Sequence, residues 1–269
     1  MLKRLFVSLI ISLALVGNSG LTPALTAKDG PQPTEAEVRD AHEIAVQFTL
    51  QFAEMKDLAP VVKDLYFENF VERYVQSRAK NPDLNSAPHA YFLPGLEYNS
   101  RLLREGSPAA WQRFYIAANN FLLFGFVSGL KKGDDAKEIK PSDLYPATVI
   151  ELLARDPNLK NMIERKGRSN PISTVEELRR ATVTLEQAGA ILRQESGSKS
   201  LLKVERNELA GLMKQDDFFK AQLEVADPEL FQFPKGTRMI IIKTPLGLQL
   251  MMARDGTKLK IFWTEIITD

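Results

Sequence analysis

The most informative absence in this 269-residue sequence is cysteine, of which there is none. Without cysteine the chain can form no disulfide, no thiolate metal site and no thiol nucleophile. Histidine is scarce as well, with only His42 and His89. Catalytic zinc and di-iron sites need several convergent ligands, typically paired histidines or repeated Glu-x-x-His motifs, and neither pattern is present. The sequence therefore predicts no metal site and no cofactor.

An excess of charge of one sign is also missing, because the formal net charge is only +1. A near-neutral chain has no overall field that would attract nucleic acid. The one local imbalance is a basic cluster made of Lys160, Arg165, Lys166 and Arg168. It lacks the interleaved aromatic residues on which nucleic-acid bases stack. We interpret the cluster as a solvated loop and expect no nucleic-acid partner.

A long apolar run that would span a bilayer is missing from the chain beyond its first 27 residues. The uncharged run Phe114–Leu130 has 17 residues and contains Asn119 and Asn120. About 17 apolar residues is the lower limit for a transmembrane helix. Gly125 and Gly129 have the small-xxx-small spacing that allows another helix to approach closely. We therefore predict a buried helix of a helical bundle, and no stable membrane span in the mature chain.

The N-terminal 27 residues have the features of a signal peptide. Lys3–Arg4 supply the positive charge, and Leu5–Val16 form a 12-residue apolar run. Signal peptides have apolar runs of roughly 7–15 residues, which are too short to act as membrane anchors. Cleavage after Ala24 or Ala27 would leave a small residue at the cleavage site. Because a lipoprotein signal requires cysteine, we predict a soluble periplasmic or secreted protein rather than a lipoprotein.

Sequence motifs for catalysis are not convincing. Ser-x-x-Lys occurs four times without its companion motifs, as a loose pattern does in a lysine-rich chain. There is no Gly-x-Ser-x-Gly, no phosphate-binding loop and no dinucleotide fingerprint. Asp216–Asp217 before two phenylalanines is interpreted as a helix cap. A pair of carboxylates could still hydrolyse a glycoside or peptide bond, but 34 acidic residues nominate no particular pair. We therefore assign no catalytic residue.

Helix-start signals organise the region from residue 34 to residue 195. Thr34 with Glu37, and Thr174 with Glu177, have the spacing of capping boxes, and Ser173 with Glu176 forms an overlapping one. Asp57 can cap a second helix with Pro60 in its first turn. Apolar residues at helical spacing extend that second helix through Tyr74.

The periodicity changes after residues 196–200 (SGSKS), which we predict to be a linker. Segment 201–223 is predicted to be helical in part. Residues 238–244, 248–254 and 259–267 have the length and apolar content of strands. Asp255–Gly256 between the last two strands is a strong hairpin signal. The alternation in the last strand leaves Phe262 on the second face of the sheet, which predicts that this face is also partly covered.

These patterns predict an α+β protein. We expect a signal peptide (1–27), a disordered lead (28–33), a helical domain (34–195), a linker (196–200) and an α+β part (201–269) that ends in a three-stranded antiparallel meander. Helices before a terminal meander, with an Asp-Gly turn leading into an apolar strand, are similar to cone-shaped α+β folds of the nuclear-transport-factor type. This resemblance covers the C-terminal strands and carries no site residue across.

Asn119 and Asn120 are the candidate binding residues. A buried amide without a partner costs about 1–3 kcal/mol, so each must find a hydrogen bond. A loop backbone is the usual partner, and a ligand pocket is the alternative. We predict an exported, non-enzymatic module that binds an envelope protein or a small apolar ligand. The alternative is a hydrolase that works through carboxylates or an unrecognised serine.

Overall fold

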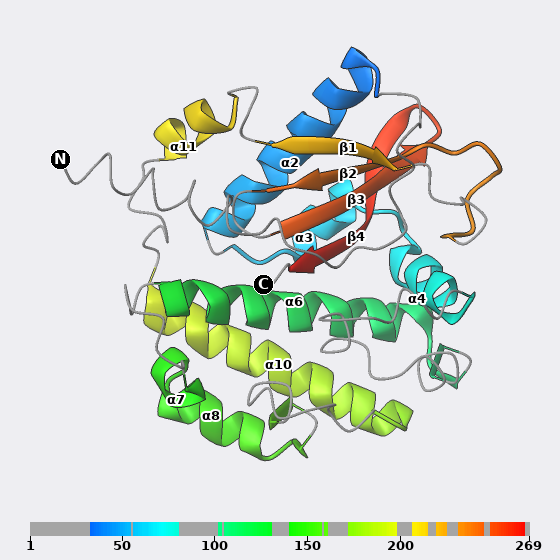
Figure 1. Cartoon of the computed structure of the whole chain (residues 1–269). Helices are drawn as coiled ribbons and strands as arrows, with labels where there is room; N and C mark the ends of the chain where they lie inside the picture. Colours follow the sequence, from blue (N-terminus) through cyan, green and yellow to red (C-terminus); the bar gives the residue numbers. More distant parts are fainter. Residues whose placement is uncertain are drawn as a thin grey trace. The chain divides into compact units, whose positions relative to one another are not determined.

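The computed structural model describes residues 33–54, 56–80, 102–103, 105–130, 140–157, 159–160, 172–197, 206–214, 219–224, 231–244 and 248–266. These residues belong to two compact units (Figure 1). The first unit comprises Met1–Leu50, Leu65–Tyr74 and Arg206–Asp269, and the second comprises Gln51–Asp64 and Val75–Glu205. The signal segment 1–27, residues 28–32 of the lead and residues 198–200 of the linker lie outside the described residues.

The segments of the two units interleave along the chain. Of the described residues, 33–50 and Leu65–Tyr74 group with the C-terminal strands rather than with the other helices. The linear division predicted from the sequence placed all of residues 34–195 together. That residues 34–195 form one helical domain stays a prediction.

The first unit is built on a four-stranded antiparallel sheet in the order β1-β2-β3-β4. Its strands are β1 (Lys220–Glu224), β2 (Met239–Lys243), β3 (Leu248–Asp255) and β4 (Lys258–Ile266). The long helix α2 (Glu35–Ala53) runs across the sheet (Figure 1). The α+β class and the terminal meander of β2, β3 and β4 are thereby confirmed.

Strand β1 was not predicted from the sequence. Its residues, KAQLE, include no β-branched or aromatic side chain, so they lack the usual composition of a strand. The strand forms because it pairs along its whole length with β2, from Lys220 opposite Lys243 to Glu224 opposite Met239. The helix α11 (Arg206–Met213) precedes it and agrees with the partly helical prediction for this region.

The turn between β3 and β4 has two residues, Gly256 and Thr257, because Asp255 still pairs with Lys258. Gly256 has a φ of 61°. A glycine of positive φ at the first central position is typical of a type II′ turn, whose twist suits a two-residue hairpin. The predicted hairpin and the positive φ are confirmed, whereas Asp255 is the last residue of β3 and Thr257 takes its place in the turn.

Replacing Gly256 with valine should lower the free energy of unfolding by about 1 kcal/mol or more, because β-branched residues resist positive φ. A Cβ at this position would meet no atom within 4 Å, so the cost comes from the backbone alone. Urea melts of Gly256→Val and of Gly256→Asn measure it. Asparagine adopts positive φ more readily, so equal losses in both variants would contradict the conformational explanation.

The outer edge of β4 is shaped by a β-bulge at Phe262. Met251 pairs with Trp263 while Met252 pairs with Ile261, so Phe262 is the extra residue. Phe262 is buried against Phe231 and Phe233, which confirms that the second face of the sheet is partly covered.

Beside the bulge, Tyr66 forms a parallel bridge with Ile261, and the Phe67 N–H donates to the Ile261 carbonyl at 2.9 Å. The helix predicted to run from residue 57 to Tyr74 is therefore wrong at this point. It is divided into α3 (Ala59–Leu65) and α4 (Phe70–Lys80), because residues 66 and 67 hydrogen-bond to the sheet edge.

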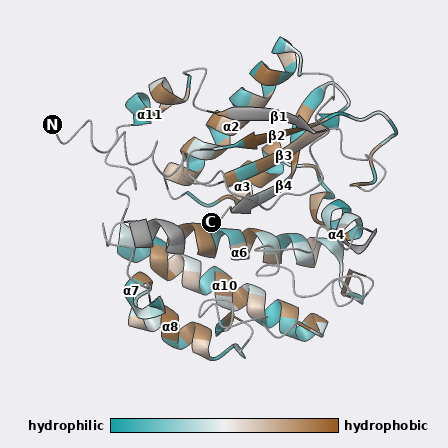
Figure 2. Cartoon of the chain, in the orientation of Figure 1, coloured by the Kyte–Doolittle hydropathy of each residue, from teal (hydrophilic) through white to brown (hydrophobic). Residues whose placement is uncertain are grey.

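The second unit is built around two long helices, α6 (Pro108–Leu130) and α10 (Val175–Ser196), which pack along each other (Figure 1). The short helices α7 (Pro141–Leu144) and α8 (Ala147–Ala154) lie beside them. Hydrophobic and hydrophilic residues alternate around the turns of α10 (Figure 2). The predicted apolar stripe of α10 is buried throughout and comprises Leu178, Ala181, Leu185, Ala188 and Leu192.

The start of α10 confirms the capping box at Thr174, whose hydroxyl accepts from the Glu177 N–H at 3.1 Å. Ser173 uses the same carboxylate, because its N–H and hydroxyl both donate to Glu177 Oε2. The hydrogen bonds from Ser173 are the largest influence on Glu177 and, with those from Thr174, they hold the pKa of its carboxyl below the usual value. The overlapping box predicted from Ser173 and Glu176 is therefore wrong in its partner, because Ser173 hydrogen-bonds to Glu177 instead.

Helix α6 is buried along most of its length, including Trp111, Phe114, Ala118 and Phe121. Within the described part of the chain, no helix has the length and apolar character required to cross a membrane. The close approach predicted at Gly125 comes from the Tyr145 ring rather than from another helix backbone. The surroundings of Gly129 lie outside the described residues.

Candidate functional site

The two predicted binding residues are both occupied by hydrogen bonds within the second unit. Asn119 is buried, and its Nδ2 donates to the Tyr115 carbonyl one turn earlier in α6, at 2.8 Å. Asn120 is also buried, and its Oδ1 accepts from the Leu58 N–H at 3.2 Å. The expected loop-backbone partner is thus found for Asn120. A role of either amide in ligand binding stays a prediction.

Asn120 also donates from Nδ2 to Asp57 Oδ1 at 3.0 Å. The same oxygen accepts from the Ala59 N–H at 2.9 Å, which confirms Asp57 as the cap of α3. The two adjacent residues Asp57 and Leu58 therefore bind both ends of one amide. This arrangement fixes the start of α3 against the middle of α6.

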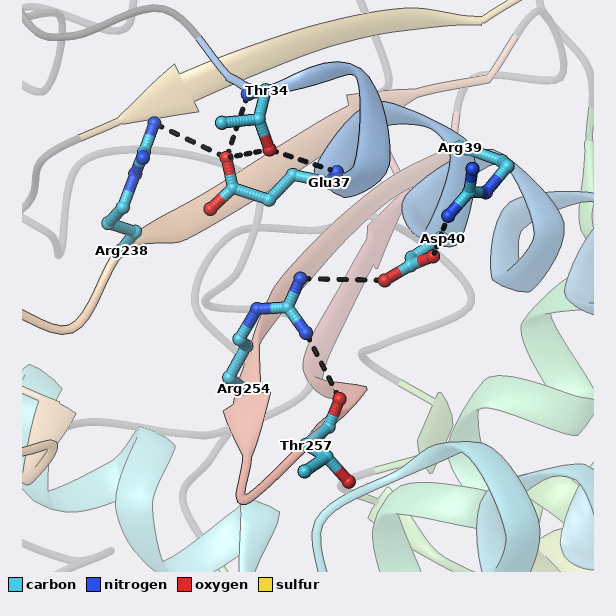
Figure 3. Close-up of polar contacts among 7 residues, drawn as sticks. All are labelled: Thr34, Glu37, Arg39, Asp40, Arg238, Arg254 and Thr257. Atoms are coloured by element: carbon cyan, nitrogen blue, oxygen red, sulfur yellow. Dashed lines mark hydrogen bonds and ion pairs between the residues drawn. The ribbon is translucent and has the colours of Figure 1, made fainter.

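In the first unit, polar contacts gather where α2 begins above the sheet (Figure 3). Glu37 Oε2 accepts from the Thr34 N–H at 2.8 Å, and the Thr34 hydroxyl accepts from the Glu37 N–H at 3.3 Å. The capping box predicted from Thr34 and Glu37 is thereby confirmed. The same carboxylate oxygen lies 3.3 Å from Nη2 of Arg238, just before β2.

These contacts decide the charge of Glu37. Burial alone would raise the pKa of its carboxyl. The hydrogen bonds from Thr34 and the positive charges of Arg238 and Arg254 outweigh that effect, so the pKa lies below the usual value. Glu37 is therefore an anion at neutral pH and is suited to accept hydrogen bonds rather than to donate a proton.

A second contact ties α2 to the hairpin. Arg254 of β3 lies 3.4 Å from the carboxylate of Asp40 through Nη2, and its Nη1 donates to the Thr257 carbonyl at 3.0 Å (Figure 3). Arg39 lies 3.8 Å from the other oxygen of Asp40. These side chains are substantially exposed, so each ion pair contributes at most about 1 kcal/mol. Their effect is to set the position of α2 along β3.

Replacing Glu37 with glutamine should lower the free energy of unfolding at pH 7 by about 1–2 kcal/mol, because the cap is weakened and Arg238 loses its anion. The folded-state pKa is lowered, so this stabilisation is complete above the unfolded carboxyl pKa of about 4.3 and is lost as the pH falls through the folded value.

Urea melts of both proteins from pH 7 to pH 3 should show a constant difference down to about pH 5 and a shrinking one below about pH 4. Asp40→Asn is the matched control at an exposed carboxylate and should cost less. A difference between Glu37→Gln and the parent that grows on acidification would contradict the lowered pKa.

Below α2 the first unit contains a cluster of aromatic side chains from α4, β4 and the segment between α3 and α4. The rings of Tyr74 and Trp263 are stacked with centroids 3.5 Å apart and planes 7° apart. Phe70 packs against both Tyr66 and Trp263. The Tyr66 hydroxyl hydrogen-bonds to the Thr264 hydroxyl. All of these residues are buried, so the cluster forms core rather than an open cleft.

Arg73 of α4 closes one side of this region. Its guanidinium lies over the rings of Phe67 and Phe233, at 5.4 and 4.6 Å from their centroids. Its Nη1 donates to the Gln232 carbonyl at 2.6 Å, and its Nε donates to Asn69 at 2.9 Å. Gln232 has a φ of 56°, a conformation that costs free energy in a residue other than glycine. Arg73 therefore compensates the strained backbone that carries Phe233 onto the sheet.

Sequence reasoning did not find the three arginines that organise the first unit, Arg73, Arg238 and Arg254. Their contacts are far apart in sequence: Arg73 and Gln232 are 159 positions apart, and Arg254 and Asp40 are 214 positions apart. No local pattern carries that information. The basic cluster at 160–168 was more conspicuous in the sequence, and most of it lies outside the described residues.

The other candidates weighed from the sequence do not form a reactive group in the part of the chain that the structure describes. No cluster of three His, Asp or Glu side chains there could hold a metal ion. His42 packs against Phe219 with ring centroids 5.8 Å apart. Its Nε2 is buried without a hydrogen-bond partner. His89, Asp216 and Asp217 lie outside the described residues.

Comparison with known proteins returned no protein-family profile, no curated protein and no solved structure that matches this chain. The similarity of the strand pattern to nuclear-transport-factor folds stays a prediction.

Proposed function

We propose that this chain is an exported binding protein of the bacterial periplasm or cell envelope and that it is not an enzyme. Its partner would be an envelope protein or a small apolar ligand, as the sequence predicts. The observation that supports binding over hydrolysis is that the buried carboxylates accept hydrogen bonds at the starts of helical segments.

The described residues contain two buried carboxylates, Glu37 and Asp156, and both serve the start of a helical segment. Glu37 accepts from Thr34, and Asp156 Oδ1 accepts from the Leu159 N–H at 3.4 Å. They belong to different compact units. Hydrolysis by a carboxylate pair needs one acid of raised pKa, whereas the pKa of Glu37 is lowered. Glu37 is therefore suited to stabilise the start of α2 and not to supply a proton.

A direct test compares the full chain with Glu37→Gln and Asp156→Asn on chromogenic glycosides and peptides. We expect no hydrolysis above the buffer rate for any of the three proteins. Carbon NMR of the Glu37 carboxyl should give a titration midpoint below the usual value. Hydrolysis by the parent that either substitution abolishes, or a Glu37 midpoint above pH 6, would contradict the proposal.

Export is tested separately by fractionation of cells and intact-mass measurement. The recovered protein should begin near Leu25 or Lys28, because the predicted cleavage sites follow Ala24 and Ala27. Replacing Leu9 with arginine breaks the apolar run and should retain the chain in the cytoplasm, whereas Leu9→Val should not. Met1 retained in a membrane pellet would contradict export.

Binding is tested in the same cells with a membrane-permeant cross-linker. A binding protein should give a discrete adduct with a different component of the exported fraction. Recovery of the chain without any such adduct would contradict the binding role and leave the export result unaffected.

A further inference from the structure

The segment that leads into β2, drawn in orange in Figure 1, contains a residue in an unfavourable backbone conformation. Gln232 has a φ of 56°, and in the described part of the chain it is the only residue other than glycine with a positive φ. Glycine and asparagine adopt this conformation at a lower cost. Strained residues persist only where the surrounding structure holds them, and they gather at functional positions. A reason for glutamine here is therefore to be sought in its side chain.

The fold holds the backbone on both sides of Gln232. Phe231 and Phe233 are buried, and each packs against Phe262 with ring centroids 5.3 Å apart. Arg73 donates from Nη1 to the Gln232 carbonyl at 2.6 Å, and its guanidinium lies 4.6 Å from the centroid of the Phe233 ring. None of these contacts uses the Gln232 side chain. That side chain is exposed and has no hydrogen-bond partner among the described residues.

The next residues form a closed turn that presents a second polar side chain. The Thr237 N–H donates to the Pro234 carbonyl at 3.0 Å, and the Thr237 hydroxyl donates to the same oxygen at 2.7 Å. Gly236 has a φ of 84°, which is typical of the third position of a type II turn. Lys235 is then at the second position. It is exposed and forms no ion pair with any described residue.

We propose that Gln232 and Lys235 form a partner-binding surface and that they bind an extended acidic segment of another protein. An amide side chain can both donate and accept, so it can pair with the N–H and C=O groups of a peptide backbone. Lys235 supplies a cation for a carboxylate of the same segment. Because the loop is already held in one conformation, binding would cost little conformational entropy. This inference rests on the proposed binding function and names its site and its class of partner.

The aromatic residues of this region favour a peptide over a carbohydrate. Phe231 and Phe233 are buried, and so is Phe67, which lies under the Arg73 guanidinium. None of these three rings is available to stack on a sugar. An acidic polysaccharide is therefore the competing ligand that the experiment must exclude.

The test is fluorescence anisotropy of the full chain with a short labelled peptide of alternating glutamate and valine. We expect saturable binding with a dissociation constant below about 1 mM, at least about tenfold weaker binding of a lysine–valine peptide, and no displacement by polygalacturonate. Gln232→Glu and Lys235→Gln should each weaken binding of the acidic peptide by about tenfold. Gln187→Glu and Lys258→Gln make the same changes at other exposed positions and should leave binding unchanged.

Gln232→Gly separates recognition from folding. Glycine relieves the strained backbone, so the melting temperature should equal or exceed that of the parent, whereas the affinity for the acidic peptide should fall as it does in Gln232→Glu. A parent that shows no saturable binding, displacement of the peptide by polygalacturonate, or a Gln232→Glu variant that binds like the parent overturns the proposal.

The adduct formed by the cross-linker in cells distinguishes this inference from the proposed function. If that adduct persists in Gln232→Gly, the chain binds its partner through another surface, so the binding function stands and the assignment to Gln232 and Lys235 is overturned. We expect the adduct to be lost in Gln232→Gly and retained in Gln187→Glu.

Discussion

Replacing Trp263 with alanine is expected to lower the free energy of unfolding by about 3–5 kcal/mol, the largest effect among the substitutions considered. Trp263 is only 3% exposed and lies between Tyr74 and Phe70. Removing the indole abolishes its packing against these two rings and leaves a cavity between β4 and α4. Urea denaturation followed by far-UV circular dichroism measures the loss.

Trp263→Phe is the matched control, because it keeps an aromatic ring against Tyr74, and it should cost less than the alanine variant. The chain has two tryptophans, so Trp111 becomes the sole fluorescent indole and reports on the second unit. A double-mutant cycle with Tyr74→Leu should give a coupling of about 0.5–1.5 kcal/mol for the stacked rings. A loss below 1 kcal/mol for Trp263→Ala would contradict the core assignment.

Replacing Gly125 with leucine is expected to destabilise the second unit by about 1–3 kcal/mol. A Cβ at Gly125 would stand 2.6 Å from Cε1 and 2.7 Å from Cζ of Tyr145, closer than real side chains approach. Tyr145 is buried and stacks on Phe121, so its ring cannot move without losing that contact. Thermal melts of the variant and the parent measure the difference.

Gly189→Ala is the matched control in the middle of α10. Its new Cβ would lie at an ordinary 3.7 Å from Arg193, so the substitution should stabilise by about 0.5–1 kcal/mol through helix propensity. Gly125→Ala should destabilise in the parent and become favourable once Tyr145→Ala has removed the ring. Melts in which Gly125→Ala and Gly189→Ala behave alike would contradict the close contact with Tyr145.

Local patterns in the sequence predicted much of the fold. The three strands of the meander, the hairpin at Gly256, and the caps at Thr34, Asp57 and Thr174 were all found, because each depends on residues close in sequence. The failures have a common physical cause. Strand β1 forms because it pairs with β2, and the helix breaks at Tyr66 because this residue bridges to Ile261. Local sequence propensity does not predict such long-range pairing.

The candidate site was predictable to a smaller extent. The need of Asn120 for a partner follows from its burial, but its attachment to Leu58 depends on how two helices meet. The arginine contacts of Figure 3 join α2 to strands near the other end of the chain. Such contacts depend on the tertiary structure. The sequence alone shows which residues are charged but not which of them form pairs.

The interleaved construction of the first unit has a consequence for the order in which the protein can mature. Tyr66 meets Thr264 across 198 positions, and α2 reaches Arg254 across 214. Chains are synthesised from the N-terminus, and non-local contacts form slowly because distant segments must first be brought together. The apolar face of α2 therefore has no sheet to cover it until the last strands leave the ribosome. This unit can therefore close its core only when synthesis of the chain is nearly complete.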